Sequence, residues 1–338
     1  MRARRAWLEV MYDNADISTY LQPYLLSWNY VDNISGQPDN LQINLEDRDQ
    51  LWVGPWMPDK GATLKAKIIQ ENKKQFDTID ELDLGLFVLD EIEIEGLPSI
   101  AAIRSMSVPV SSALRGSAKN RAWEETSLSV VAGDLAKEAG LKLFYDTDDN
   151  PEYDRVEQTE ESDLTFLMRL CNDAGLALKI TGTQIVIFDE QKYEQQAPIT
   201  RIKKGEGYIK KYRGRTTLNN VYKSCRVEYH DANKDLNIKH TFTPPNPPNT
   251  ERVLVINERV ASTKEAERLA RKRLRQKNKK AMTFTLDLLG DVRFVAGLTV
   301  RLVGFGVFDG NYVITKADHS HGSGYKTVLE LRKCLEGY

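Results

Sequence analysis

Short runs of alternating polar and apolar residues dominate both ends of the chain. Residues 40–46 alternate strictly, which puts three leucine or isoleucine side chains on one face of an extended segment. Similar segments, rich in β-branched and aromatic residues, recur between residues 7 and 108 and again between residues 208 and 331. Gly, Asp and Asn residues separate them, as is typical of antiparallel strands joined by tight turns. The pattern predicts two β regions, each a barrel or sandwich.

The first β region ends near residue 108. Its predicted strands run over residues 7–11, 25–31, 40–46, 63–69, 85–94 and 100–108. In the fifth strand the even-numbered side chains are apolar apart from Asp90, whereas the odd-numbered ones become polar toward the end. Strict alternation therefore predicts one apolar face along the even positions of this strand.

Two amphipathic helices are predicted between the β regions, at residues 128–139 and 163–174. Each has a candidate cap at both ends, and these are Ser127 and Gly140 for the first helix and Ser162 and Gly175 for the second. Short strands accompany the helices at residues 141–145, 176–180 and 184–188. The small, polar residues 111–119 predict a linker. A small α+β module is therefore expected here.

The second β region follows Pro198. Strands are predicted at residues 208–212, 220–230 and 252–257 and again within residues 283–331, and residues 243–249 form a proline-rich loop. Ser262 and Glu265 have the spacing of a capping box, which predicts a helix with a thin Ala/Leu stripe. We therefore expect three domains, at residues 1–108, 109–197 and 198–338. No precise sequence repeat is evident, although the similar texture of the two β regions is compatible with a repeat of two barrels.

Composition narrows the class of protein. The chain has 338 residues, of which 41% are hydrophobic and 28% charged, with a net charge of −2. These values are ordinary for a soluble globular protein and predict neither a nucleic-acid nor a membrane partner. No apolar run approaches the roughly 20 residues that cross a bilayer, and no signal-peptide core follows the N-terminus. Synthesis in the cytosol is the expectation. The three cysteines have no CxxC spacing and predict small buried side chains.

The predicted helix near residues 264–280 is strongly basic. Its cations are Lys264, Arg268, Arg271, Lys272, Arg273, Arg275, Lys277, Lys279 and Lys280. Three interpretations remain open: a solvated helix whose Ala/Leu stripe covers a barrel, a surface for an acidic protein partner, and a nucleic-acid surface. No interleaved aromatic residue would stack on bases, which favours the first two.

Candidate chemistry is sparse. His319 and His321 could supply two metal ligands, but no nearby cysteine or third histidine completes a site. Carboxylate pairs are frequent, yet no G-x-S-x-G, HExxH or P-loop motif occurs. Trp52, Trp56 and Trp123 are expected to anchor a core or a subunit interface. We predict no catalytic residue, no cofactor site and no metal site, and hence no enzyme.

An ordered series of residues resembles the late control protein D family, the central baseplate hubs of contractile phage tails. The N-terminal part of the series is Asp39, Leu41, Ile43, Leu45, Glu46, Asp47, Trp52, Trp56, Pro58 and Gly61. The middle part is Leu114, Arg115, Arg121, Trp123, Leu128, Val131, Leu135, Gly140, Leu141 and residues 161–170. The C-terminal part is Gly310, Tyr312, Ile314, His319, Gly324, Tyr325, Thr327 and Leu329. The hub portion of type VI secretion spike proteins is similar.

The resemblance implies a structural protein and a specific assembly. It implies a mainly β chain with two β-barrel hub domains flanking the α+β module. It further implies a homotrimer whose six barrels form a quasi-sixfold ring, adapting a sixfold tail tube to a trimeric spike. The implied partners are a tail spike protein, a tail tube or tube-initiator protein and baseplate wedge proteins, with no specific nucleic acid and no stable membrane insertion. The implied location is the baseplate of a virion or tail-like particle made in the bacterial cytoplasm.

No β-helical spike or wall-degrading domain is evident in the sequence, so the spike is expected to be a separate chain. The basic helix at residues 264–280 is expected to face away from the ring's channel. The alternative functions are a nucleic-acid-binding β protein that uses this helix and a carbohydrate-binding β module that uses exposed tryptophans.

Overall fold

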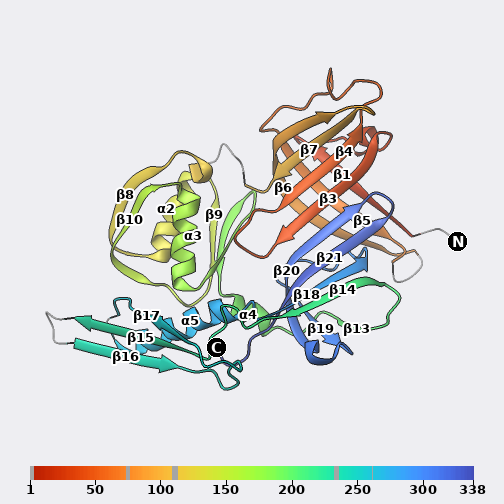
Figure 1. The fold of residues 1–338 in the computed structure, drawn as a ribbon. Helices are drawn as coiled ribbons and strands as arrows, with labels where there is room; N and C mark the ends of the chain where they lie inside the picture. The colour runs from red at the N-terminus through yellow and green to blue at the C-terminus, as the bar shows by residue number, and fades with distance from the viewer. Residues whose placement is uncertain (1–3, 74–76, 109–112, 232–235, 261) are drawn as a thin grey trace.

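The computed structural model describes residues 4–73, 77–108, 113–231, 236–260 and 262–338. The chain is mainly β, and its strands join into one large, largely antiparallel sheet and three small sheets. Figure 1 shows two groups of strands on one side and two smaller α/β units on the other. Part of the predicted linker, residues 109–112, lies outside the described residues.

The N-terminal strand set contains the first seven strands and a short helix. These are β1 (Arg5–Tyr12), β2 (Ala15–Asp16), α1 (Ser18–Leu21), β3 (Leu25–Asn33), β4 (Asn40–Glu46), β5 (Thr63–Glu71), β6 (Ile79–Glu95) and β7 (Ile100–Met106). A single apolar core lies between them, with Trp28, Phe87 and Leu45 fully buried. The six strands predicted here are all present.

The face prediction for β6 is only half right. Phe87 and Leu89, at odd positions, are buried, whereas Leu86 and Val88 are half-exposed. A β-bulge at Asp90 then shifts the pairing with β7, and Ile92 packs against the core instead. A bulge inserts one extra residue, so the inward parity changes from odd to even at this point. Glu91, Glu93 and Glu95 consequently point to the exposed side.

The α+β module packs two helices against small sheets. It comprises η1 (Ala113–Arg115), β8 (Lys119–Ser127), α2 (Leu128–Glu138), β9 (Lys142–Asp146), β10 (Glu152–Glu161), α3 (Asp163–Ala174), β11 (Ala177–Ile180), β12 (Gln184–Phe188) and α4 (Glu190–Glu194). The Ser162 hydroxyl caps α3 by accepting a hydrogen bond from the Thr165 amide, and Gly175 ends the helix with a left-handed conformation. Ser127 stands at the N-cap of α2, but its side chain makes no capping hydrogen bond. Asn150 accepts one from the Ser129 amide in its place.

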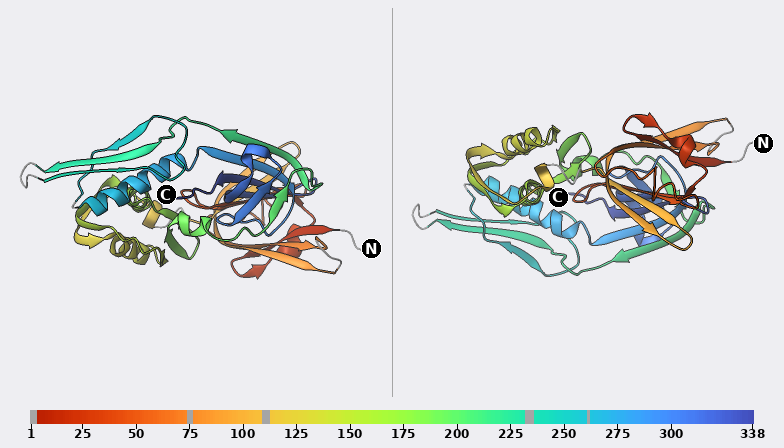
Figure 2. Two further views of the ribbon diagram at one scale, coloured as in Figure 1. Left: turned by 90° about the horizontal axis from the view of Figure 1, so that it is seen from below. Right: turned by 90° about the horizontal axis from the view of Figure 1, so that it is seen from above.

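The C-terminal strand set contains β13 (Arg201–Lys203), β14 (Ile209–Thr216), β18 (Met282–Leu289), β19 (Thr299–Val303), η2 (Gly306–Phe308), β20 (Gly310–His321) and β21 (Tyr325–Lys333). Between β14 and β18 the chain forms a hairpin–helix subdomain. It consists of β15 (Ser224–Asp231), β16 (Leu236–Phe242), β17 (Val253–Ile256) and α5 (Thr263–Asn278), with its own core. Figure 2 shows this subdomain extending away from both strand sets.

Both strand sets share one topology. Along the sheet the N-terminal set runs β3-β4-β7-β6-β5-β1, and the C-terminal set runs β14-β18-β21-β20-β19-β13. If β2 is left out and the strands of each set are numbered in chain order, both sheets have the order 2-3-6-5-4-1. The first strand of one set therefore corresponds to the first strand of the other, the second to the second, and so on. The outermost strands differ in direction, because β13 runs parallel to β19 whereas β1 runs antiparallel to β5. The repeat that the sequence left open is therefore present in the fold.

Local irregularities repeat as well. Bulges lie at Leu26 in β3 and at Lys210 in β14, each next to the start of its strand. The bulge at Asp90 in β6 matches one at Thr315 in β20. Gly61 and Gly297, both with φ near +90°, donate equivalent hydrogen bonds to the carbonyls of Leu89 and Ile314 at 2.9 and 2.8 Å. Bulges are specific features rather than defects, so their coincidence fixes the residue correspondence between the two sets.

The two sets join through a pairing of β3 with β20, from Trp28–His321 to Asn33–Lys316. Two separate closed barrels were predicted, but among the described residues the strand pairings close neither set on itself. Instead one thirteen-stranded sheet runs through both sets. The β3–β20 pairing is the link that makes the sheet continuous.

Candidate functional site

The basic helix α5 lies between the small sheet of its own subdomain and the α+β module. Its narrow apolar stripe, formed by Ala266, Ala270 and Leu274, is completely buried in the subdomain core. The Ser262 hydroxyl accepts a hydrogen bond from the Glu265 amide, as the capping-box spacing predicts. The stripe therefore covers a small three-stranded sheet and not one of the large strand sets.

Most cations of α5 have acidic partners within the chain. Arg268 lies 2.7 Å from Asp149, and Arg273 lies 2.9 Å from Glu258. The Lys272 ammonium contacts Asp149 and donates a hydrogen bond to the carbonyl of Ala174 at 2.9 Å. The acidic residues that pair with the helix thus come from the neighbouring module and from the helix's own subdomain. An acidic protein partner stays a prediction. A helix occupied in this way has few cations left for nucleic acid.

A buried ionic cluster joins α4, α5 and β21. Arg332 of β21 donates a hydrogen bond to Glu190 at 2.8 Å and also contacts Glu194. Arg275 donates to Glu194 at 2.6 Å, and Lys279 lies 3.1 Å from Glu190. Burial disfavours the charged form of Glu190, but Arg332, Lys279 and Arg275 outweigh it and lower the pKa of Glu190 to about 2. Buried charges of both signs therefore fasten three parts of the chain together.

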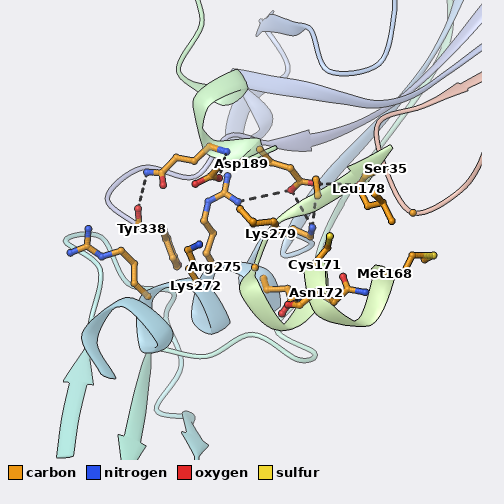
Figure 3. Close-up of a pocket in the computed structure, with 18 of the residues that line it drawn as sticks. Ser35, Met168, Cys171, Asn172, Leu178, Asp189, Lys272, Arg275, Lys279 and Tyr338 are labelled. Carbon is orange, nitrogen blue, oxygen red and sulfur yellow. Dashed lines mark hydrogen bonds and ion pairs between the residues drawn. The ribbon is translucent and has the colours of Figure 1, made fainter. Parts of the chain in front are cut away.

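A small pocket of about 120 Å³ adjoins this cluster. Figure 3 shows side chains from α3 and α5 and the C-terminal Tyr338 around it. The Tyr338 carbonyl accepts a hydrogen bond from Gln191 at 2.8 Å, and its hydroxyl accepts one from Asn278 at 2.9 Å. The cations that line the pocket already have acidic partners, which are Glu190 for Arg275 and Lys279 and Asp149 for Arg268 and Lys272. Among the described residues, the pocket is therefore a packing junction without a convergent set of free cations.

A second ionic cluster connects the module with both strand sets. Lys179 of β11 lies 2.6 Å from Asp32 and 3.0 Å from Asp39. The second carboxylate oxygen of Asp32 accepts a hydrogen bond from the Ala296 amide of the C-terminal set at 2.7 Å. Burial, reinforced by the neighbouring Asp32 and opposed by Lys179, raises the pKa of Asp39 to about 6. Asp32 of β3 consequently links the N-terminal strand set to both the module and the C-terminal strand set.

His319 occupies the pairing of β3 with β20 and is fully buried. Its Nε2 lies 2.8 Å from the Phe294 carbonyl, which only a donor satisfies, so Nδ1 accepts a hydrogen bond from the Tyr325 hydroxyl at 2.7 Å. Burial lowers the pKa of His319. His321 instead stacks on Trp28. Within the part of the chain that the structure describes, no group of three potential metal ligands occurs.

The three candidate tryptophans lie in two different places. Trp52 is buried in the N-terminal core, and Trp123 stacks on Phe166 of α3. Trp56 is 39% exposed and lines an apolar groove of about 410 Å³ beside α1. No helix in the described ranges is long and apolar enough to cross a membrane. Trp52 and Trp123 are therefore core anchors, and both Trp52 and Trp56 border the groove.

Sequence reasoning named Asp39, Arg275 and Lys279 for other reasons and missed the other residues of the two ionic clusters. Glu190, Glu194 and Arg332 had no motif to mark them, because their partners lie 81 to 142 residues away in the chain. Lys179 offered a signal, since it interrupts an otherwise apolar strand of four residues. A cation in such a position usually needs a buried carboxylate as its partner.

The chain is mainly β and contains two strand sets of one topology. Residues 105–325 match the family described as the phage tail baseplate hub (GPD), and the chain belongs to this family. The family is structural and not enzymatic. The N-terminal series from Asp39 to Gly61, on which the resemblance partly rested, lies outside the matched range.

Known relatives agree with this assignment. The chain is 29% identical over 177 residues to a probable baseplate hub protein of Escherichia phage P2, and the aligned part covers 49% of this chain. That part is only 41% of the phage P2 protein, so the chain matches less than half of this relative's length.

Two solved structures share the fold. The 43 kDa tail protein of prophage MuSo2 from Shewanella oneidensis has a TM-score of 0.73 at 14% identity, covering 98% of this chain and 99% of that one. A component of the Escherichia coli type VI secretion system has a TM-score of 0.61 at 13% identity, covering 99% of this chain and 78% of that one.

Proposed function

We propose that the chain forms a homotrimer that joins a sixfold tail tube to a trimeric spike in a baseplate. The observation that carries this proposal is the repeated strand order of the two strand sets. Three chains with two equivalent sets each provide six similar units around one axis. A ring of head-to-tail contacts closes only when the rotations add up to a full turn, which six steps of about 60° achieve.

In this proposal, the two strand sets of each chain take the place of the two predicted barrels. Each strand set is a curved, open β unit that completes its edges with a neighbouring set and not with itself. The domains at residues 1–108 and 198–338 then form the ring, and the α+β module at residues 109–197 is fastened to it through the two ionic clusters. The helix α5 faces away from the channel, because Arg268, Lys272 and Arg273 pair with acidic residues of that module.

The partners follow from the same geometry. The trimer offers six equivalent units to a tail tube or tube-initiator protein and three equivalent units to a spike protein. Baseplate wedge proteins surround the ring, and the assembled location is the baseplate of a virion or tail-like particle made in the bacterial cytoplasm. The hub acts mechanically, without binding a specific nucleic acid and without stable membrane insertion.

Light scattering of the purified chain tests the trimer, alone and mixed with the spike protein encoded beside it. We expect a species of three times the 38.5 kDa chain mass, alone or in a complex with three spike chains. A chain that remains a monomer with every tail protein tested contradicts the proposal. The groove beside Trp56 also permits a carbohydrate-binding function, and protection of tryptophan fluorescence from quenching by added sugars would favour that alternative.

A further inference from the structure

Two strand edges of opposite charge are unpaired in the described part of the chain. One is the outer edge of β14, at the rim of the large sheet, which pairs only with β18 (Figure 1). Its cations are Lys210, Lys211, Arg213 and Arg215, and within the described residues none of these four side chains forms an ion pair or hydrogen bond. An exposed strand edge with unpaired backbone groups is a template for pairing with another chain.

The other free edge belongs to the last third of β6. Residues up to Val88 pair with β5 on one side, and residues from Val88 to Glu95 pair with β7 on the other. The β5 side of residues 90–95 therefore has no partner strand among the described residues. This segment contains Asp90, Glu91, Glu93 and Glu95, and the last three are exposed. In the described parts of the chain, only Glu91 and Glu93 of this segment have a cationic partner, which is Arg104 of β7 at 2.8 Å.

The internal repeat indicates which strands can pair along these two edges. In the C-terminal set the strand equivalent to β6 is β20, and the strand equivalent to β14 is β3 in the N-terminal set. β20 and β3 pair with each other inside the chain. β3 pairs along the same edge of β20 as β19, beyond the residues at which the pairing with β19 ends. The corresponding pair, β6 with β14, is not formed within the chain.

We propose that β14 of one copy pairs, antiparallel, with residues 91–95 of β6 in a second copy. This inference rests on the proposed trimer and specifies its subunit interface. It makes the contact between chains a repeat of the β3–β20 contact within each chain. Six nearly equal contacts then alternate around the ring, three within chains and three between them.

The bulges define the register. Counted from the bulges at Leu26 and Lys210, Arg213 and Arg215 correspond to Asn29 and Val31. Counted from the bulges at Thr315 and Asp90, the residues that correspond to Asp318 and Ser320 are Glu93 and Glu95.

Within the chain Asn29 is opposite Ser320, and Val31 is opposite Asp318. Arg213 is therefore expected opposite Glu95, and Arg215 opposite Glu93. The internal pairing also contains a diagonal hydrogen bond, from Asn29 to Asp318 at 2.6 Å. Its counterpart between copies is Arg213 with Glu93, so the polar link of the internal contact becomes an ionic one.

Charge also disfavours the pairing of two identical edges. Two β14 edges would bring four cations against four, and two β6 segments would bring carboxylates against carboxylates. Like charges directly opposite each other on paired strands are destabilising, whereas opposite charges attract. Only the head-to-tail combination remains, which is the combination that a closed ring requires.

Charge reversal tests the interface. We expect the double variant Arg213→Glu/Arg215→Glu, and separately Glu93→Arg/Glu95→Arg, to weaken association by roughly a hundredfold, since each places like charges opposite each other. Combining all four changes in one chain should restore the trimer. A mixture of the two double variants cannot substitute for this test, because a ring of three cannot alternate two kinds of subunit. Circular dichroism confirms that each variant is folded.

Cysteine cross-linking tests the register independently of charge. Opposed residues in antiparallel strands have Cα atoms about 4.5–5.5 Å apart, which suits a disulfide. We expect Arg213→Cys/Glu95→Cys to give covalent dimers and trimers under mild oxidation. The matched control is Arg213→Cys/Glu81→Cys, because Glu81 lies in the part of β6 that is already paired with β5. The wild-type chain shows any background from its native cysteines.

The outcomes separate the inference from the function on which it rests. Cross-linking together with rescue by the fourfold variant supports the β6–β14 interface. A wild-type trimer that ignores the charge reversals and does not cross-link overturns the interface and leaves the trimeric hub standing. A chain that stays monomeric with its spike overturns both.

Discussion

Glu190 shows how a single residue stabilises a contact between parts of the chain. It is buried, yet three cations from α5 and β21 keep it ionised. A buried carboxylate that lost these partners would destabilise the fold, because an unpaired charge in the interior is costly. The same holds for its neighbour Glu194, which is even less exposed.

The lowered pKa of Glu190 predicts a dependence of stability on pH. Its folded-state pKa of about 2 lies below the ordinary value of 4.5, so the carboxylate's contribution is complete above pH 4.5 and is lost as the pH falls toward 2. The contribution is about 3 kcal/mol. Denaturant unfolding between pH 7 and 2 measures it. In Glu190→Gln this part of the pH dependence should vanish, and an identical profile in variant and wild type would contradict the assignment.

His319 is a second residue with a structural role that can be tested. Replacing it with Phe keeps the ring but leaves the Phe294 carbonyl and the Tyr325 hydroxyl without their partner. We expect a loss of about 2–4 kcal/mol in the free energy of unfolding. The control is Ser320→Ala, in the next position of β20 but partly exposed. Equal stability of the two variants would show that the histidine contributes no buried hydrogen bonds.

At the scale of the element, sequence patterns predicted the position of most strands and helices. The bounds of β4, α3 and β12 agree with the predictions to the residue, because each has a clear period and clear terminal signals. The capping box of α5 was also read correctly. Sequence patterns predict an element well when residues within that element determine its structure.

The elements that sequence reasoning missed lack such signals. β8 and β10 form a charged two-stranded sheet with few buried side chains, and β16 also lacks a continuous apolar face. Ion pairs such as Arg155 with Glu124 link β8 and β10 across the pair. These segments form strands because they pair with neighbouring strands, and the sequence of one segment alone does not identify its partner.

Gly182 connects two elements and supports a third prediction. It lies in the turn between β11 and β12, where an added Cβ would come within 2.5 Å of the Leu86 carbonyl oxygen in β6. Gly182→Val should therefore cost about 1–3 kcal/mol and loosen the module from the N-terminal strand set. Limited proteolysis between the module and β7 measures the loosening. Gly207→Ala, which has open space around its Cβ, serves as control, and equal cleavage of the two variants would refute the contact.

At the scale of the whole molecule, the repeat in topology explains what sequence could not. The two strand sets share their order and their bulges, but a strand of one set has little sequence in common with its counterpart. Val31 and Arg215, for example, occupy equivalent positions. The two strand sets share a backbone topology although their side chains differ. The similar length and composition of the two β regions therefore indicated a repeat, but no matching residue pattern demonstrated it. The continuity of the sheet across β3 and β20 was likewise invisible, because it joins segments about 290 residues apart.

The central claim is that six similar strand sets from three chains form one ring. Electron microscopy of the assembled hub, viewed down its axis, tests this claim most directly. We predict a closed ring of six lobes that repeats exactly every third of a turn and only approximately every sixth. A twofold particle, an open filament, or a trimer in which strand sets from neighbouring chains do not touch would contradict it.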